Sequence, residues 1–110
     1  MIDLRSDTKS LPPPEMLQAI MDAELGDDVD GEDPTVNALE ARCAELLGKQ
    51  AALFVPSGTH GNLVSIYTLI RPGEELICHR LAHMYHYERG GISAICGALV
   101  RPIPGDYGTL

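Results

Sequence analysis

The stretch LFVPSGTHGN, residues 53–62, decides the fold because it links two apolar segments through residues with very small side chains. The apolar run at 51–55 does not alternate with polar residues, which predicts a strand buried on both faces. Pro56 ends that strand, and a helix is predicted over 58–70, ahead of the Arg71-Pro72-Gly73 breaker. This order of strand, tight turn and helix favours an α/β layer architecture.

The turn formed by Ser57, Gly58 and Thr59 has the chemistry of an anion site. Ligands of open α/β sheets bind beyond the carboxyl ends of the strands, where this turn is expected to lie. A helix start offers unpaired backbone N–H groups and a partial positive charge, and glycine lets a phosphate approach closely. A simple helix cap without a ligand explains the same residues equally well. The Walker ending GK[ST] is absent, and Pro56 is incompatible with a nucleophile elbow.

Helices alternate with short apolar segments along the rest of the chain. Asp33 and Pro34 form a clear helix start, and Gly26 and Gly48 each end a helical pattern. The expected elements are, in order, an extended segment at 1–14, a helix at 15–24, a loop at 26–33, a helix at 34–47, a strand at 51–55, a helix at 58–70, a strand at 74–78, a short helix at 83–88 and a strand at 98–103. This order predicts an α/β fold with a mostly parallel sheet.

Charge is distributed unevenly along the chain. Residues 1–45 hold twelve acidic and three basic residues, a balance of −9, whereas residues 46–110 hold four acidic and five basic residues. The acidic part would repel nucleic acid and anionic lipid, so we expect neither as a partner. No apolar run is long enough to cross a bilayer and no secretory signal is present, so we expect a cytoplasmic protein with no membrane partner. Three widely spaced cysteines without a CxxC pair indicate reduced thiols.

Three histidines lie close together in CHRLAHMYHYE, residues 78–88. His79 and His83 are four residues apart and His86 follows three later, so a helix could bring pairs onto one face. The HExxH motif and a nearby carboxylate pair at ligand spacing are both missing, so we expect no metal. Two interpretations stay open, namely half-buried histidines without a ligand, and an imidazole that lies flat on a ring-shaped cofactor.

The acidic loop GDDVDGED, residues 26–33, does not fit a calcium site. Aligning Gly31 with the glycine of an EF-hand loop places Gly26 and Asn37 where the first and last ligands must be. Neither residue supplies a carboxylate. We therefore interpret the loop as a solvated acidic turn.

Six motifs in one register along the whole chain carry a family resemblance. They are LRSDT (4–8), GDDV-x-GEDPTVN-x-LE (26–40), LLGK-x-AALFVPSGT-x-GN (46–62), RPGEE (71–75), AH-x-x-x-YE-x-GG (82–91) and RP-x-PGD-x-GTL (101–110). Together they resemble the low-specificity L-threonine aldolases, which are pyridoxal-phosphate enzymes of the aspartate-aminotransferase fold. The resemblance implies the N-terminal part of the large domain of a fold-type I pyridoxal-phosphate-dependent enzyme.

The resemblance also implies roles for individual residues. The cofactor phosphate would be held by Ser57, Gly58 and Thr59. His83 would cover one face of the cofactor ring and lie near the substrate hydroxyl. Ser6 matches a residue that helps to bind the substrate carboxylate, and Tyr87 occupies a position that lines the substrate side chain.

This sequence departs from the family pattern at several points. Asp30 stands where the family usually has a tyrosine, and Lys9-Ser10 stands in place of Val-Thr. The chain has two lysines, Lys9 and Lys49, and neither matches the Schiff-base lysine of the family. We therefore expect an extended segment at 1–14 followed by an incomplete cofactor-binding domain at 15–110.

The implied reaction is cleavage of L-threonine or L-allo-threonine to glycine and acetaldehyde, with pyridoxal 5'-phosphate as cofactor. The substrate is thus a small β-hydroxy amino acid, and His83 is the candidate for helping the hydroxyl proton to leave. A related β-eliminating lyase and a non-catalytic remnant are the alternatives. The family suggests a homo-oligomer at full length, and we expect residues 1–110 alone to be inactive.

Overall fold

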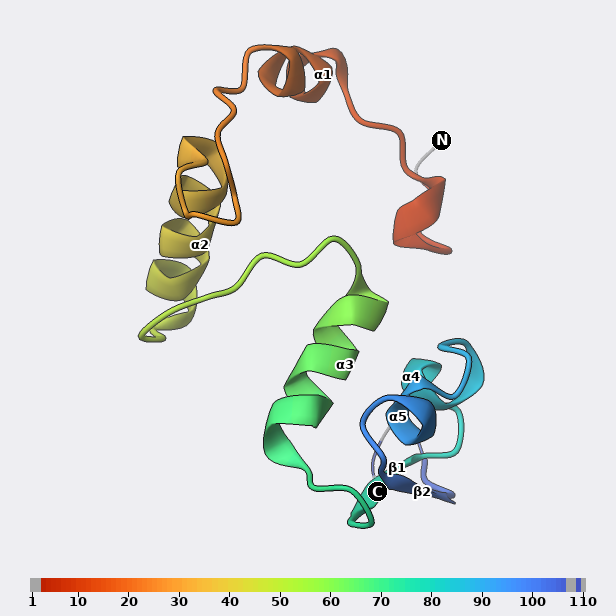
Figure 1. Cartoon of the computed structure of the whole chain (residues 1–110). Helices are drawn as coiled ribbons and strands as arrows, with labels where there is room; N and C mark the ends of the chain where they lie inside the picture. The colour runs from red at the N-terminus through yellow and green to blue at the C-terminus, as the bar shows by residue number, and fades with distance from the viewer. Residues whose placement is uncertain (1–2, 107–108, 110) are drawn as a thin grey trace. The chain divides into compact units, whose positions relative to one another are not determined.

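A computed structural model describes residues 3–106 and 109 of the chain (Figure 1). The chain divides into two compact units, Met1–Phe54 and Val55–Leu110. The first unit is helical, and the second combines helices with a small sheet. The expected site residues other than Ser6 all belong to the second unit.

The first unit contains the 3-10 helix η1 (Asp7–Lys9) and the helices α1 (Pro14–Met21) and α2 (Pro34–Leu47). A turn of η1 therefore lies inside the segment that was expected to be extended. Helix α1 begins at a proline, as the fixed φ of proline allows at a first helical position. It ends three residues earlier than predicted. No residue of α1 is buried, so the helix gains no stability from packing that would favour a longer helix.

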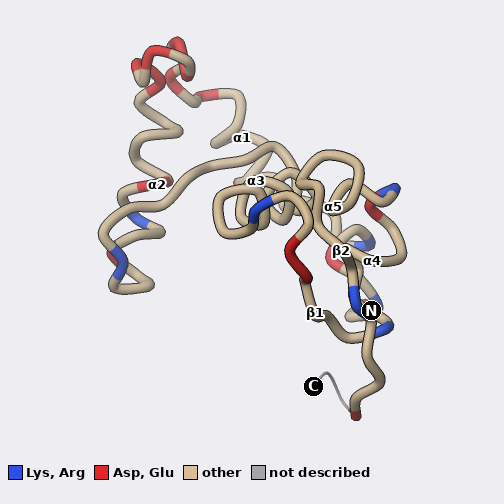
Figure 2. Tube along the Cα trace, turned by 60° about the horizontal axis from the view of Figure 1, so that its bottom comes forward, with Lys and Arg blue, Asp and Glu red and all other residues tan. Residues whose placement is uncertain are grey.

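Helix α2 has the two ends that the sequence predicts. Asp33 caps its start, because one carboxylate oxygen accepts hydrogen bonds from the backbone N–H groups of Thr35 and Val36, both at 2.9 Å. Gly48 ends the helix in the left-handed conformation, with φ of 60°. The acidic residues of the segment 27–33 follow one another closely along the loop that leads into α2, drawn in red in Figure 2.

The second unit contains α3 (Gly58–Leu69), β1 (Glu75–His79), α4 (His83–His86), α5 (Gly91–Ala94) and β2 (Leu99–Ile103). Strands β1 and β2 pair in parallel, with Glu75 opposite Leu99 and His79 opposite Ile103. This pairing confirms the α/β fold with parallel strands. Helix α5 was not predicted; Gly90 at its start adopts a left-handed φ of 69°, so the Gly90-Gly91 pair opens a helix rather than only breaking one.

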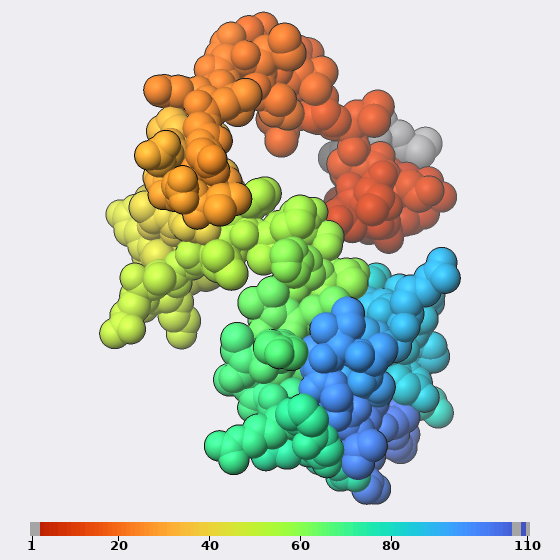
Figure 3. Space-filling model, in the orientation of Figure 1, coloured from red at the N-terminus to blue at the C-terminus, as the bar shows by residue number. Residues whose placement is uncertain are grey.

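A small core holds the second unit together. Helix α5 contacts α3, α4 and β2, and Figure 3 shows the α3 surface against the segment that follows α4. The buried residues of this core are Ile66, Ile92, Cys96 and Ala98. This packing fixes α3 and α4 relative to one another within the unit.

The prediction of a buried strand at 51–55 is wrong. These residues form no strand, and the side chains of Leu53 and Phe54 are 69% and 48% exposed. A strand needs a hydrogen-bonded neighbour, and in the described part of the chain β1 and β2 pair only with each other. The backbone N–H of Phe54 instead donates to the Glu40 carboxylate at 2.6 Å.

Among the residues that the structure describes, no helix combines the length and the apolar character that crossing a bilayer requires.

Candidate active site

The turn before α3 has the geometry of a capped helix start. Ser57 is the N-cap in an extended conformation, and its Oγ accepts a hydrogen bond from the backbone N–H of His60 at 3.1 Å. The Ser57 carbonyl accepts from Gly61 N–H at 3.0 Å. Residues 57–59 therefore lie at a helix N-terminus, as predicted, although no strand precedes them.

Gly58 and Thr59 leave an open, electropositive space at this helix start. Within the described residues, their backbone N–H groups donate to no other group, as is usual for the first positions of a helix. A Cβ built on Gly58 would meet no atom of the described residues within 4 Å, and the φ of Gly58 is not in the left-handed region. The described part of the chain therefore gives no steric reason for glycine here, whereas an approaching anion would need that space. These groups fit a phosphate.

His83 is the first residue of α4, and its side chain is 67% exposed. Its Nδ1 lies 2.8 Å from Oε1 of Glu88. Only Nδ1 is engaged by a buried group among the described residues. Since the side chain is largely exposed, most of the ring and its other nitrogen remain available to a ligand.

Glu88 is the residue of this site that the sequence analysis did not single out. Its side chain is completely buried, and its Oε1 also accepts a hydrogen bond from the Asn62 side-chain amide at 2.7 Å. Its second oxygen, Oε2, is buried with no hydrogen-bond partner among the described residues. A signal was present, since Asn62 and Glu88 belong to the motifs SGT-x-GN and YE-x-GG, but their contact joins residues 26 positions apart.

The Glu88 carboxylate brings the start of α3 and His83 to the same side of the unit. Asn62 follows Thr59 by three residues, so the two lie on one face of α3, about 4.5 Å apart along its axis. Asn62 and His83 share one acceptor atom, Oε1 of Glu88. His83 is thus connected through Glu88 to Asn62, which lies one helical turn after Thr59 on α3.

A tight turn fixes the position of Glu88. Arg89 has a φ of 55° and Gly90 a φ of 69°, so two successive residues are left-handed, a conformation that is unfavourable for arginine. The Glu88 carbonyl accepts from Gly91 N–H at 3.0 Å. A Cβ on Gly91 would come within 2.8 Å of a Leu63 methyl group, so glycine allows this turn to pack closely on α3.

His79 and His86 do not share a ligand position with His83. The His79 ring lies 3.0 Å from the Gly105 carbonyl oxygen, and the His86 ring lies 2.6 Å from that of Arg80. Each histidine therefore has its own partner. In the described part of the chain, no three His, Cys, Asp or Glu side chains group as metal ligands would.

Tyr87 and Ser6 lie in different surroundings. The exposed Tyr87 ring lies next to His83, with ring centroids 5.2 Å apart and planes inclined by 43°. Ser6 belongs to the first unit, where its Oγ accepts from Thr8 N–H at 3.3 Å and caps η1. A role of either residue toward a substrate stays a prediction.

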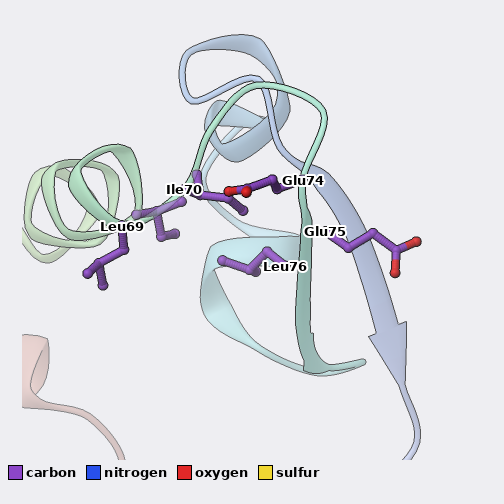
Figure 4. Close-up of a pocket in the computed structure, with 6 residues that line it drawn as sticks. Leu69, Ile70, Glu74, Glu75 and Leu76 are labelled. Carbon is purple, nitrogen blue, oxygen red and sulfur yellow. The ribbon is translucent and has the colours of Figure 1, made fainter.

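An apolar hollow of about 530 Å³ lies between α3 and the beginning of β1. Figure 4 shows Leu69, Ile70 and Leu76 on one side, whereas Glu75 points away on the other side of β1. Arg101 pairs with Glu75 there and lowers the pKa of its carboxyl group. None of the expected site residues lines this hollow, which lies at the amino end of the strand rather than at the carboxyl end.

Comparisons with known proteins place these motifs in a family. The family model described as "Beta-eliminating lyase" matches residues 3–110. The chain is 52% identical to the low specificity L-threonine aldolase of Escherichia coli K12 over 106 residues, which are 96% of this chain and 31% of that protein.

Two eukaryotic proteins show the same pattern. Low-specificity L-threonine aldolase 1 of Arabidopsis thaliana is 50% identical over 96% of this chain and 30% of its own length. The low specificity L-threonine aldolase of Saccharomyces cerevisiae is 42% identical over 98% of this chain and 29% of its own length. The chain thus spans about a third of the length of these relatives.

Proposed function

Because the chain belongs to the beta-eliminating lyase family, we propose that it forms the phosphate-binding part of a pyridoxal-phosphate-dependent lyase. The proposed reaction is cleavage of L-threonine or L-allo-threonine to glycine and acetaldehyde. The observation that carries the proposal is the link, through Glu88, between the open start of α3 and the exposed ring of His83. The names of the relatives support the same substrate class.

Each site residue has a proposed task that its surroundings support. The backbone N–H groups of Gly58 and Thr59, together with the hydroxyl groups of Ser57 and Thr59, would hold the cofactor phosphate. When bound, pyridoxal phosphate supplies an electron sink for the Cα–Cβ bond that breaks. His83 would cover the cofactor ring, and its free nitrogen would accept the proton of the β-hydroxyl group, directly or through water.

The remaining residues and properties are proposed from the family resemblance. Ser6 would help to bind the substrate carboxylate, and Tyr87 would line the space for the substrate side chain. Residues 15–110 would form part of a larger cofactor-binding domain preceded by a segment at 1–14. The whole protein would act in the cytoplasm as a homo-oligomer.

The test measures products from the full-length gene product, purified with pyridoxal phosphate and supplied with L-threonine or L-allo-threonine. We expect glycine and acetaldehyde in equal amounts. His83→Asn should lower kcat by about 10²-fold or more, as expected for loss of a positioned proton acceptor. The matched control, His86→Asn, changes a ring three residues away whose partner is the Arg80 carbonyl, and it should leave kcat unchanged.

A second reaction, β-elimination, is favoured by the description of the matching family model. It would convert L-threonine to 2-oxobutanoate and ammonia rather than to glycine and acetaldehyde. These products in place of glycine would overturn the aldolase proposal and support the eliminating lyase. No product from any β-hydroxy amino acid would support a non-catalytic remnant.

A further inference from the structure

We propose that Glu88 is a positioning residue that fixes the proton arrangement of His83, with hydrogen on Nδ1 and a free lone pair on Nε2. This inference rests on the proposed function, because it assigns Nε2 as the atom that accepts the substrate proton. It concerns a contact inside the chain, however, and that contact is measurable without a reaction.

The hydrogen bonds around Glu88 set the direction of the contact. The Asn62 side-chain amide nitrogen has only hydrogens to offer, so Oε1 of Glu88 is an acceptor in the 2.7 Å bond. The same Oε1 lies 2.8 Å from Nδ1 of His83, and a carboxylate oxygen has room for two hydrogen bonds. Nδ1–H therefore donates to Oε1. In the neutral ring the other nitrogen, Nε2, then carries the lone pair.

The burial of Glu88 indicates a role beyond stability. The carboxylate is completely buried, and Oε2 has no partner in the part of the chain that the structure describes. Such a group costs folding free energy that an apolar residue of similar size would not cost. The strained left-handed conformation of Arg89 directly after it adds to that cost. A strained residue and an unpaired polar atom thus lie next to the exposed ring of His83.

The geometry resembles the way buried carboxylates orient histidines in other enzymes. A carboxylate behind the ring holds one nitrogen, selects the tautomer and limits rotation of the ring. Asn62 extends this support to α3, so the ring is held relative to the helix start that would bind the phosphate. Glu88 would thus act on the reaction through His83 without touching the substrate.

The first test reads the tautomer directly by NMR. Full-length gene product labelled with ¹⁵N-histidine gives long-range ¹H–¹⁵N spectra of the rings, and the signal lost in His83→Asn identifies His83. We expect hydrogen on Nδ1 and none on Nε2 at a pH where the ring is neutral. Glu88→Met keeps the volume but removes the acceptor, and it should give a mixture of both tautomers. Glu88→Gln keeps an acceptor oxygen and should keep the wild-type tautomer.

The second test separates positioning from a purely structural role. We expect Glu88→Met to lower kcat about 10²-fold while KM and the affinity for pyridoxal phosphate change less than about twofold. Glu88→Gln should recover part of kcat. The matched control is Glu45→Met, at an exposed carboxylate of the first unit that pairs with Arg42, and it should behave like the wild type.

The outcomes distinguish this inference from the proposed function. An unchanged His83 tautomer in Glu88→Met would overturn the inference, and so would a changed tautomer with unchanged kcat. If Glu88→Met does not fold, the wild-type spectrum decides, because hydrogen on Nε2 of His83 would overturn the inference. Asn62→Leu should then keep the tautomer but lower kcat, since it loosens the ring without removing its acceptor, and an unchanged kcat would count against positioning. A wild-type protein that cleaves no β-hydroxy amino acid refutes the proposed function, whereas the NMR result still decides the Glu88–His83 contact.

Discussion

The open space beside the Gly58 Cα indicates why this position holds glycine. Its backbone would accept a side chain without strain, and the space that a Cβ would occupy is open. Glycine at the start of a helix is usually less favourable than alanine, because it loses more conformational freedom on folding. A residue that costs stability and fills no structural need is well explained by the close approach of a ligand.

We predict that Gly58→Ala raises the dissociation constant of the full-length gene product for pyridoxal phosphate about tenfold, which corresponds to about 1.4 kcal/mol. The unfolding temperature should stay the same or rise, since alanine is favoured in the helix by roughly 0.5–1 kcal/mol. Titration of the cofactor absorbance measures the affinity, and calorimetry measures the unfolding. Gly61→Ala, one turn further along α3, is the matched control, and equal affinities of the two variants would contradict the prediction.

Helix α2 and the loop before it show how far an element follows from its own residues. Asp33 not only caps α2 but also accepts a hydrogen bond from Gly26 N–H at 2.9 Å, which closes the loop. Hydrogen bonds from Val36 and then Gly26 lower the pKa of the Asp33 carboxyl group below its usual value of 3.8. The Asp33 carboxylate therefore ties the beginning of the loop, at Gly26, to the first turn of α2.

The Asp33 cap should make α2 sensitive to acid. Because the folded-state pKa is lowered, the ionised group stabilises the fold above pH 3.8, and this contribution is lost as the pH falls through the lowered pKa. Urea unfolding of the full-length gene product at a series of acidic pH values measures the effect. Asp33→Asn should be less stable at pH 7, because its side-chain NH₂ group would replace the oxygen that accepts the Gly26 N–H and two donors would face each other. The variant should also lose this part of the pH dependence of stability. An unchanged acid profile in Asp33→Asn would contradict this account.

Gly26 should be the least replaceable residue of this loop. A Cβ there would lie 2.2 Å from the Glu32 carbonyl oxygen, so the backbone itself must move. We expect Gly26→Ala to reduce the free energy of unfolding by about 1–3 kcal/mol, as in other overpacked sites. Gly31→Ala provides the comparison, since a Cβ on Gly31 meets no atom within 4 Å and only its left-handed φ of 71° opposes the change. Denaturant unfolding measures both variants, and a smaller loss at Gly26 than at Gly31 would refute the steric explanation.

The elements that sequence analysis predicted correctly carry their signals locally. Asp33, Pro34 and Gly48 specify both ends of α2 without help from distant residues. Two other features depend on residues that are distant in the sequence. A strand at 51–55 would need a neighbouring strand to pair with, and the burial of Glu88 accompanies its contact with Asn62 on α3. A run of apolar residues cannot show which strand it would pair with, and the contact of Glu88 with Asn62 spans 26 residues. The sequence therefore predicted that helices begin near Ser57 and His83, but not that Glu88 connects His83 to Asn62.

At the scale of the whole molecule, the small core buries few of the large apolar residues that the structure describes. The fully buried apolar side chains are few, whereas many large ones are exposed, among them Leu46, Leu47, Tyr67, Leu69 and Leu99. Exposed apolar groups of this extent are typical of surfaces that other protein segments cover. We therefore expect a polypeptide of residues 1–110 to associate with itself at micromolar concentrations.

The lysines of residues 1–110 determine whether this polypeptide can bind the cofactor covalently. Both lysines, Lys9 and Lys49, are exposed, and neither matches the Schiff-base lysine of the family that the sequence resembles. Residues 1–110 then offer pyridoxal phosphate a few N–H and hydroxyl contacts and one imidazole. Such hydrogen bonds contribute about 1–3 kcal/mol each before the cost of immobilising the ligand.

We thus predict weak, reversible cofactor binding and no cleavage of threonine by residues 1–110 alone. The measurement combines cofactor absorbance, borohydride treatment followed by mass spectrometry, and an assay for glycine. Lys9→Arg and Lys49→Arg should bind the cofactor as the unmodified polypeptide does, because neither lysine takes part. A borohydride-stable adduct on Lys9 or Lys49, together with glycine released from threonine, would show that this stretch of chain holds a complete site after all.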